Sequence, residues 1–133
     1  MIRTFLDSGV LIAAARAVDR EGERAIQLLE EPNRLFLTSP FIYLECVPKA
    51  IFYRRWLEQA FYEKYFGSAT WVQDVVRIET VARTEAASSG LAAMDALHIA
   101  AARLSDAEQF VTIEKPPKAI HRSSLVKVVY LFR

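Results

Sequence analysis

The chain has 133 residues, of which 53% are apolar and 25% charged, and this length suits one domain over residues 1–133 and is too short for two comfortable cores. Its formal net charge of +1 excludes strong nonspecific binding of nucleic acid through bulk charge, so any polyanion site must be a local patch. The single cysteine excludes an intramolecular disulfide. No segment has the roughly 20 apolar residues of a membrane span, and the N-terminus does not resemble a signal peptide. We therefore expect a cytoplasmic protein.

The first part of the chain is predicted to alternate strands and helices. A short strand over residues 2–6 is followed by helix-forming residues after Gly9. Asp19 is well placed to cap a second helix that runs to Pro32, and residues 34–39 form a second predicted strand.

Residues 40–67 are helical by composition, with Gly67 placed as the C-terminal stop. Pro48 is expected to kink or interrupt this helix, because it lacks the N–H for a bond to Leu44 and its ring crowds that carbonyl.

The rest of the chain is predicted to contain two helices, at 80–89, closed by Gly90, and at 93–104. It is also predicted to contain three strands, at 75–79, 109–113 and 125–131. Strands that alternate with helices favour an α/β fold whose parallel sheet is covered on both faces. In such sheets, ligand sites collect beyond the carboxyl ends of the strands.

Four acidic residues stand alone in apolar surroundings. Asp7 and Glu114 follow the first and fourth predicted strands, whereas Glu45 and Asp95 lie in apolar helical segments. Three of these acids also have an ordinary structural explanation. Asp7 or Asp95 would cap a helix, and Glu45 would form an ion pair with Lys49, four residues on.

Four carboxylates brought together without a counter-charge would have raised pKa values and would destabilise the fold. A cluster that stays ionised needs a hard divalent cation, and oxygen ligands suit Mg²⁺ or Mn²⁺. Zinc is disfavoured because only His98, His121 and Cys46 are available, without usable spacing.

Four segments containing these acids occur in order along almost the whole chain, and they read FLDSGVLI, TSPFIYLEC, AAMDALHIAAA and FVTIEK. They resemble the four acidic blocks of the PIN domain, and more narrowly those of VapC-type toxins of toxin–antitoxin pairs. The resemblance implies a Rossmann-like three-layer α/β/α sandwich with a central, mostly parallel five-stranded sheet. It also implies a Mg²⁺- or Mn²⁺-dependent endoribonuclease that cleaves single-stranded RNA, is often a homodimer and is held inactive by an antitoxin.

The resemblance assigns roles residue by residue. Asp7, Glu45 and Asp95 match the first three acids of the family, which implies that they hold the metal and act in catalysis. Ser8 matches the small hydroxyl residue that often follows the first acid.

The last block departs from the family pattern. Thr112 and Glu114 match its hydroxyl and its acid, but Glu114 stands where the family usually has Asp. The segment KPPKAIHR (115–122) replaces the usual short helix and its aromatic anchor with two prolines. Both departures concern the fourth metal ligand and a second metal, and neither affects the first three acids.

The chemistry implied is metal-assisted phosphodiester hydrolysis, in which a metal-bound water becomes a hydroxide near neutral pH and attacks in line. Substrate contacts are expected from Ser8, Thr112, Lys49 and Lys115, and other basic residues that could take part are Arg54, Arg55 and Lys118. Solvated surface charge is an equally good explanation for each basic residue.

Two further features are open to more than one interpretation. His98 lies on the same helix face as Asp95 and either points toward the site or is a satisfied, half-buried histidine. Aromatic residues from Phe41 to Phe66 are too many for one small core, so part of them is expected to form a helical-hairpin surface for dimerisation or for an antitoxin segment.

Two alternatives to an enzyme remain. The altered last block is compatible with a nonhydrolytic PIN-like module that binds RNA or serves as a scaffold. A receiver-like phosphoacceptor domain also places Asp at strand ends, but its adjacent acidic pair and its lysine after the last strand are not clear in this sequence.

Overall fold

The computed structural model describes residues 1–132, and its centre is a five-stranded sheet in the order β3-β2-β1-β4-β5. The central strand β1 (Ile2–Leu6) pairs in parallel with β2 (Arg34–Thr38) and with β4 (Gln109–Thr112). The edge strands β3 (Thr70–Trp71) and β5 (Val128–Tyr130) pair in parallel with β2 and β4. The parallel α/β sheet expected from the sequence is confirmed.

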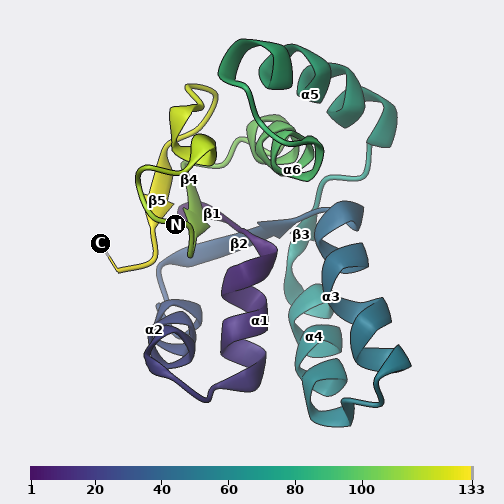
Figure 1. Ribbon diagram of the computed structural model, residues 1–133. Coiled ribbons are helices and arrows are strands. Elements are labelled where there is room, and N and C mark those ends of the chain that lie inside the picture. The colour runs from purple at the N-terminus through teal and green to yellow at the C-terminus, as the bar shows by residue number, and fades with distance from the viewer. Residues whose placement is uncertain (133) are drawn as a thin grey trace.

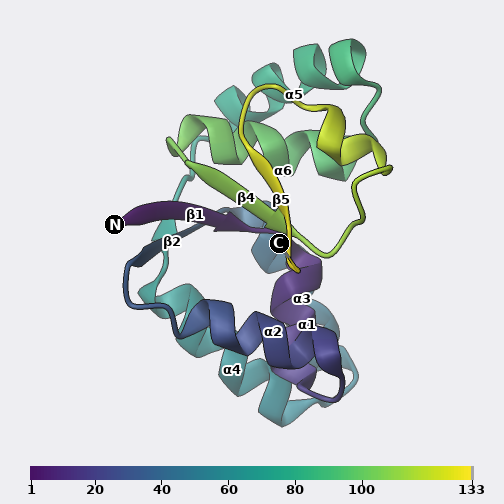
Figure 2. The same cartoon turned by 90° about the vertical axis from the view of Figure 1, so that its left-hand side faces the viewer.

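Helices cover the sheet on both sides. On one side lie four helices, α1 (Ser8–Arg16), α2 (Arg20–Leu29), α3 (Pro40–Phe52) and α4 (Trp56–Ser68), and α3 and α4 form an antiparallel hairpin beside α1 (Figure 1). The opposite side is covered by α5 (Val75–Ser89) and α6 (Ala93–Leu104), as the turned view in Figure 2 also shows. This layering is the three-layer sandwich that the sequence predicts.

The C-terminal part continues with α5 (Val75–Ser89), α6 (Ala93–Leu104) and a short 3₁₀ helix, η1 (Ala119–Arg122). Gly90 ends α5 in the left-handed region with a φ of 67°, as expected. The 3₁₀ helix shows that the two prolines in residues 115–122 do not prevent a short helix in that segment.

The predicted strand over residues 75–79 is wrong, because these residues form the first turns of α5. Asp74 caps this helix, and its side chain accepts a hydrogen bond from the backbone N–H of Arg77 at 3.1 Å. Val75 and Val76 are exposed, at 44% and 79%, whereas Ile78 is fully buried. Burial three residues after an exposed Val75 does not follow the alternation of a half-buried strand. The third strand lies earlier, at Thr70–Trp71.

The long helix predicted over residues 40–67 is two helices. Pro48 lies inside α3 without ending it, and the chain turns instead at Arg54, whose φ is 55°. Gly67 is not a stop, because α4 continues to Ser68. The last strand is also shorter than the predicted range of 125–131.

The core joins the sheet to the helices on both sides. The rings of Phe5 on β1 and Phe110 on β4 stack with their centroids 5.6 Å apart, and both residues are fully buried. Ile99 of α6 and Leu11 of α1 are also fully buried. None of the described helices combines the length and the apolar character needed to cross a membrane.

Candidate active site

Asp7 lies at the edge of the sheet where β1 ends and α1 begins, and only 8% of the residue is exposed. The backbone N–H of Ser8 donates to Oδ1 of Asp7, and the hydroxyl of Thr112 donates to Oδ2, each at 2.9 Å. Because β1 and β4 are parallel neighbours, with Leu6 opposite Val111, their carboxyl ends meet at the same edge. The first and last acidic blocks of the sequence therefore meet at Asp7.

Gly9 permits the close approach of α1 to the end of β4. A Cβ atom at this position would stand 2.8 Å from Cγ1 and Cδ1 of Ile113, which is closer than real Cβ atoms come. A larger residue would force the side chain of Ile113, the residue before Glu114, to move.

Glu45 reaches this edge from the middle of α3 and meets His98 of α6. Nε2 of His98 forms a hydrogen bond with Oε1 of Glu45, and this bond is the main reason why the pKa of Glu45 lies below its usual value. Burial opposes the effect, and the Ser8 hydroxyl and the Lys49 ammonium add to it. His98 is 1% exposed, and its Nδ1 has no hydrogen-bond partner among residues 1–132.

Asp95 lies half-buried in the first turn of α6. Burial raises its pKa, and the negative charges of Glu114 and Glu45 raise it further, against the opposing effect of His98. Burial likewise raises the pKa of Asp7, and the charge of Asp95 contributes to this shift. These effects place the other three predicted acids within electrostatic reach of Asp95.

Glu114 is held differently from the other three acids, because it is exposed and follows the last residue of β4. Its backbone N–H donates to Oγ1 of Thr112 at 3.1 Å, and its carbonyl oxygen lies 2.7 Å from Nε2 of His121. Both contacts fix the backbone and leave the carboxylate without a hydrogen-bond partner in the described part of the chain.

The donor set suits a hard divalent cation, since Mg²⁺ prefers oxygen ligands, keeps several waters and is commonly bound by one or two carboxylates plus substrate phosphates. The raised pKa values of Asp7 and Asp95 mark a site whose negative charge a cation would neutralise. Within residues 1–132, no three acidic, histidine or cysteine side chains converge closely enough to hold an ion by themselves. The oxygen donors alone suit Mg²⁺ or Mn²⁺, and water or substrate oxygens would have to complete the coordination of such an ion.

The ordinary explanations for these acids have different outcomes. Asp7 does cap α1, in addition to its place at the sheet edge that carries Asp7 and Glu114, called the acidic edge below. Asp95 does not cap α6, because the N-cap position is Ala92. Glu45 pairs across the fold, and Lys49 forms no ion pair within the described residues.

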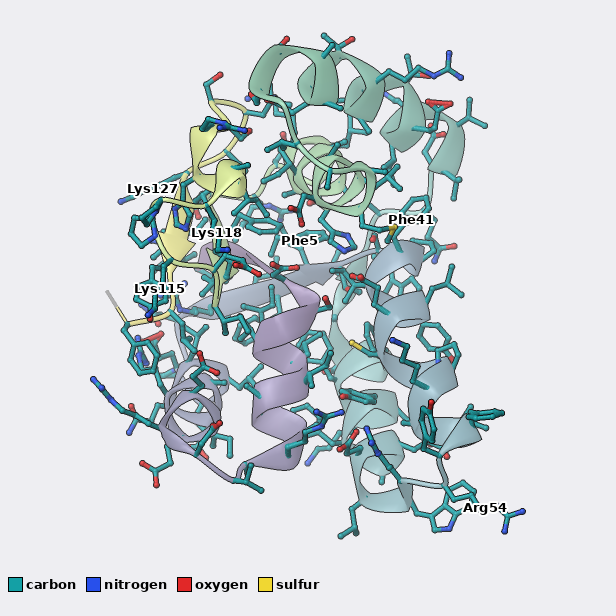
Figure 3. All side chains as sticks on the ribbon, in the orientation of Figure 1. Phe5, Phe41, Arg54, Lys115, Lys118 and Lys127 are labelled. Carbon is teal, nitrogen blue, oxygen red and sulfur yellow. The ribbon has the colours of Figure 1, made fainter. Side chains whose placement is uncertain are left out.

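The basic residues considered as substrate contacts lie in different places. Figure 3 shows Lys115 and Lys118 on the segment that follows β4, whereas Arg54 points away at the far end of the α3–α4 hairpin. Lys49 lies one turn from Glu45 and lowers its pKa. Arg54 is therefore too remote to contact a phosphate bound at the acids.

Two residues have roles that the sequence alone did not reveal. The hydroxyl of Thr112, predicted to contact substrate, donates to Asp7 and holds its carboxylate in place. His98 pairs with Glu45, which lies 53 residues away in the chain. The only sequence signal for this pairing is that His98 shares a helix face with Asp95.

No protein-family model and no curated protein sequence match the chain, but solved structures do. A VapBC complex from Rickettsia felis, bound to a DNA fragment from its promoter, is 15% identical with a TM-score of 0.73, over 97% of this chain and 98% of that chain. A toxin–antitoxin complex from Klebsiella pneumoniae is 19% identical with a TM-score of 0.72, over 96% and 97%. A VapC toxin from Mycobacterium tuberculosis that cleaves the sarcin–ricin loop is 17% identical with a TM-score of 0.63, over 80% and 86%.

The first two likenesses extend over nearly the whole chain, and the α/β fold described above matches that of these structures. VapC toxins are PIN-domain proteins, the group that the four acidic blocks of this sequence resemble. The chain therefore has the PIN-domain fold of VapC toxins.

Proposed function

We propose that this protein is a Mg²⁺- or Mn²⁺-dependent endoribonuclease that cleaves single-stranded RNA and acts as the toxin of a toxin–antitoxin pair. The observation that supports the proposal is the electrostatic coupling of Asp95 to the other three acids, Asp7, Glu45 and Glu114. Burial and a neighbouring carboxylate raise the pKa of Asp7, and burial and two neighbouring carboxylates raise that of Asp95. The fold supports it, because a VapC toxin of this fold cleaves the sarcin–ricin loop.

Asp7 and Asp95 would hold the metal, with Glu45 and Glu114 beside them. The bound ion would supply a hydroxide by lowering the pKa of its water and would offset charge on the phosphate. Asp7 is oriented by its bonds to Ser8 and Thr112, so its oxygens keep one direction without substrate. Preorganised charges of this kind stabilise a transition state without further rearrangement.

The direct test is cleavage of a labelled single-stranded RNA by the purified protein, with Mn²⁺ and with EDTA. We expect cleavage only with the metal, and loss of cleavage in Asp95→Asn. Glu30→Gln, which removes an exposed carboxylate at the end of α2, is the matched control and should cleave like the wild type. Metal-independent cleavage, or full activity of Asp95→Asn, would contradict the metal site.

The partners proposed are an antitoxin and a second copy of the chain. The structures of similar fold include VapBC complexes, in which toxin and antitoxin are bound together. The turn of the α3–α4 hairpin exposes large apolar side chains, with Phe52 at 78%, Trp56 at 59% and Leu57 at 89%. Exposed apolar surface of this kind is a common feature of protein interfaces. Sedimentation of the wild type and of Phe52→Ser/Trp56→Ser will show whether these residues mediate self-association.

One observation favours the nonhydrolytic alternative. Glu45 is engaged by His98, and no three potential ligands converge within residues 1–132. A protein that binds single-stranded RNA but does not cleave it with Mg²⁺ or Mn²⁺ would be the RNA-binding module, so the same assay, combined with an RNA-binding measurement, separates the two functions.

A further inference from the structure

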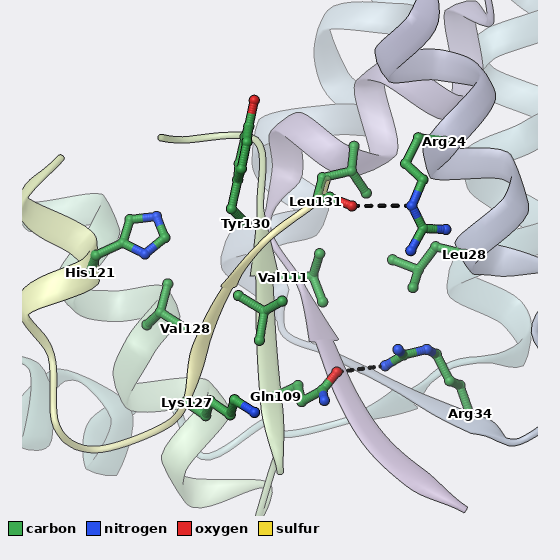
Figure 4. A pocket seen from close by; sticks show the side chains of 11 residues that line it. Arg24, Leu28, Arg34, Gln109, Val111, His121, Lys127, Val128, Tyr130 and Leu131 are labelled. Atoms are coloured by element: carbon green, nitrogen blue, oxygen red, sulfur yellow. Dashed lines mark hydrogen bonds between the residues drawn. The ribbon is translucent and has the colours of Figure 1, made fainter. Parts of the chain in front are cut away.

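A pocket of about 400 Å³ lies apart from the acids, between α2 and the β4–β5 edge of the sheet (Figure 4). Arg24 and Arg34 reach into it from one side, and His121 and Lys127 stand on the other, with Val111 between them. The volume is within the range of pockets that hold small ligands or single building blocks of larger ones.

The lining of the pocket is cationic, and no acidic residue lines it in the described part of the chain. Arg34 is already neutralised, because its Nε lies 2.6 Å from Oε2 of Glu31. Arg24 donates only from Nε, to the carbonyl of Leu131 at 3.2 Å, and Lys127 is exposed and forms no ion pair within residues 1–132. Arg24 and Lys127 therefore supply the surplus positive charge.

An aromatic ring completes the pocket. Tyr130 projects at its rim, half-buried, and its ring meets that of Phe132 edge to face, with centroids 5.5 Å apart. Leu28 and Val111 add apolar surface to the wall. A nucleotide combines the two matching groups, a phosphate for the cations and a flat base for the ring, and single-stranded nucleic acid is commonly bound in this way.

The pocket is connected to the acidic edge. His121 lines it, and Nε2 of the same ring contacts the backbone carbonyl of Glu114 at 2.7 Å. Figure 3 shows Lys115, Lys118 and Lys127 on the same side of the molecule, along the segment that follows β4 and the approach to β5. A single-stranded RNA that extends from the acids past Glu114 would pass these lysines on its way to the pocket.

We propose that the pocket binds one nucleotide of the RNA substrate outside the scissile phosphate, with its phosphate on Arg24 and Lys127 and its base against Tyr130. This inference rests on the proposed function, because it assigns a second contact to the same RNA. An acidic peptide would satisfy the cations, but it would make no use of the ring of Tyr130, so the combination favours RNA.

The test measures binding of a labelled single-stranded RNA of about 12 nucleotides to Asp7→Asn protein in EDTA, where no cleavage occurs. Adding Lys127→Ala should weaken binding by about three- to tenfold near 0.1 M salt and reduce the slope of log affinity against log salt by about 0.7. Tyr130→Leu should weaken binding by about fivefold or more and leave the slope unchanged, because a base stack carries no phosphate charge.

Arg77→Ala is the matched control, since it removes an exposed cation on α5, on the other side of the sheet, and should change neither affinity nor slope. Equal affinities and slopes for Lys127→Ala and the parent protein, or RNA binding too weak to measure in both, would contradict the proposal that the pocket binds a nucleotide of the RNA. Absence of cleavage by the wild type would instead refute the proposed function and leave the binding result unaffected, so the two failures are distinguishable.

Discussion

The acidic edge is built in two ways, and the difference between them is instructive. Asp7 lies at the N-cap of α1, and Glu45 and Asp95 lie within α3 and α6. Hydrogen bonds fix where the carboxylates of Asp7 and Glu45 point, and Asp95 is half-buried. Glu114 lies beyond the end of β4, exposed, with two prolines close behind it in the chain. Acids on regular elements are held in place before a metal binds, whereas Glu114 must be ordered by what binds to it. Substitutions in the two regions should therefore have unequal effects.

The largest effect is expected from Asp7→Asn. Asn keeps the size of the side chain and still caps α1, but it removes the charge from the most firmly held acid. We expect RNA cleavage to fall by at least about a hundredfold, because loss of a metal ligand costs several kcal/mol of transition-state stabilisation. Single-turnover cleavage rates in Mn²⁺ measure it, with melting temperature as the check on folding. Activity within a few-fold of wild type would remove Asp7 from the metal site.

A smaller effect is expected at Glu114. Its longer, exposed side chain suits a contact through water, so Glu114→Gln should lower the cleavage rate by no more than about tenfold. Glu114→Asp should not restore the full rate, because the shorter side chain falls short in a backbone fixed by Thr112 and His121. Rates across a Mn²⁺ titration make the comparison with Asp7→Asn. Equal and complete loss in both variants would show that Glu114 is a primary ligand.

The third expectation concerns stability and metal. Cation binding to the folded state alone raises the melting temperature by mass action, and millimolar Mn²⁺ should raise that of the wild type by a few degrees. Asp7→Asn should lose most of this increase, while Glu114→Gln should keep most of it. Calorimetry in EDTA and in Mn²⁺ provides the measurement. An unchanged wild-type melting temperature would favour the nonhydrolytic module.

The smallest effect is on the pH dependence of stability in EDTA. The folded-state pKa values of Asp7 and Asp95 are raised above their ordinary value of 3.8, so the folded protein binds more protons than the unfolded chain. Stability from these two groups therefore falls as pH rises from 3.8 through their folded pKa values. Glu45, whose pKa is lowered, has the opposite sign and loses its contribution as pH falls.

Asp7→Asn should accordingly flatten the fall in stability as pH rises above 3.8 and make the metal-free protein more stable at neutral pH. Denaturant titrations at several pH values test this, with Glu30→Gln again as the control. If the stability of the wild type and that of Asp7→Asn changed with pH by the same amount, the raised pKa of Asp7 would be contradicted.

The parts of the fold that the sequence predicted well are those in which local pattern and burial agree. The strand at residues 2–6 and the helix at 93–104 are both buried, and their predicted bounds match β1 and α6. The strand predicted at 75–79 is wrong because Val75 and Val76 face solvent and only Ile78 is buried, and the capping hydrogen bond of Asp74 favours a helix. Apolar character alone does not distinguish these cases.

The candidate site was predictable in its members and not in its geometry. The acids stood out because each is isolated among apolar residues. The pairing of Glu45 with His98 and the bond from Thr112 to Asp7 depend on tertiary packing between distant segments, which no local pattern encodes. The basic pocket joins α2 to the β4–β5 edge, and for the same reason nothing in the sequence indicated it.

The pairing of β1 with β4 determines when the acidic edge can form during synthesis of the protein. The hydroxyl that holds Asp7 belongs to Thr112, which is made 105 residues after it. A nascent chain that stops before β4 leaves the central strand with one open side and its acid without that support. The acidic edge is therefore assembled only after β4 has been made, and products that end before β4 would lack it.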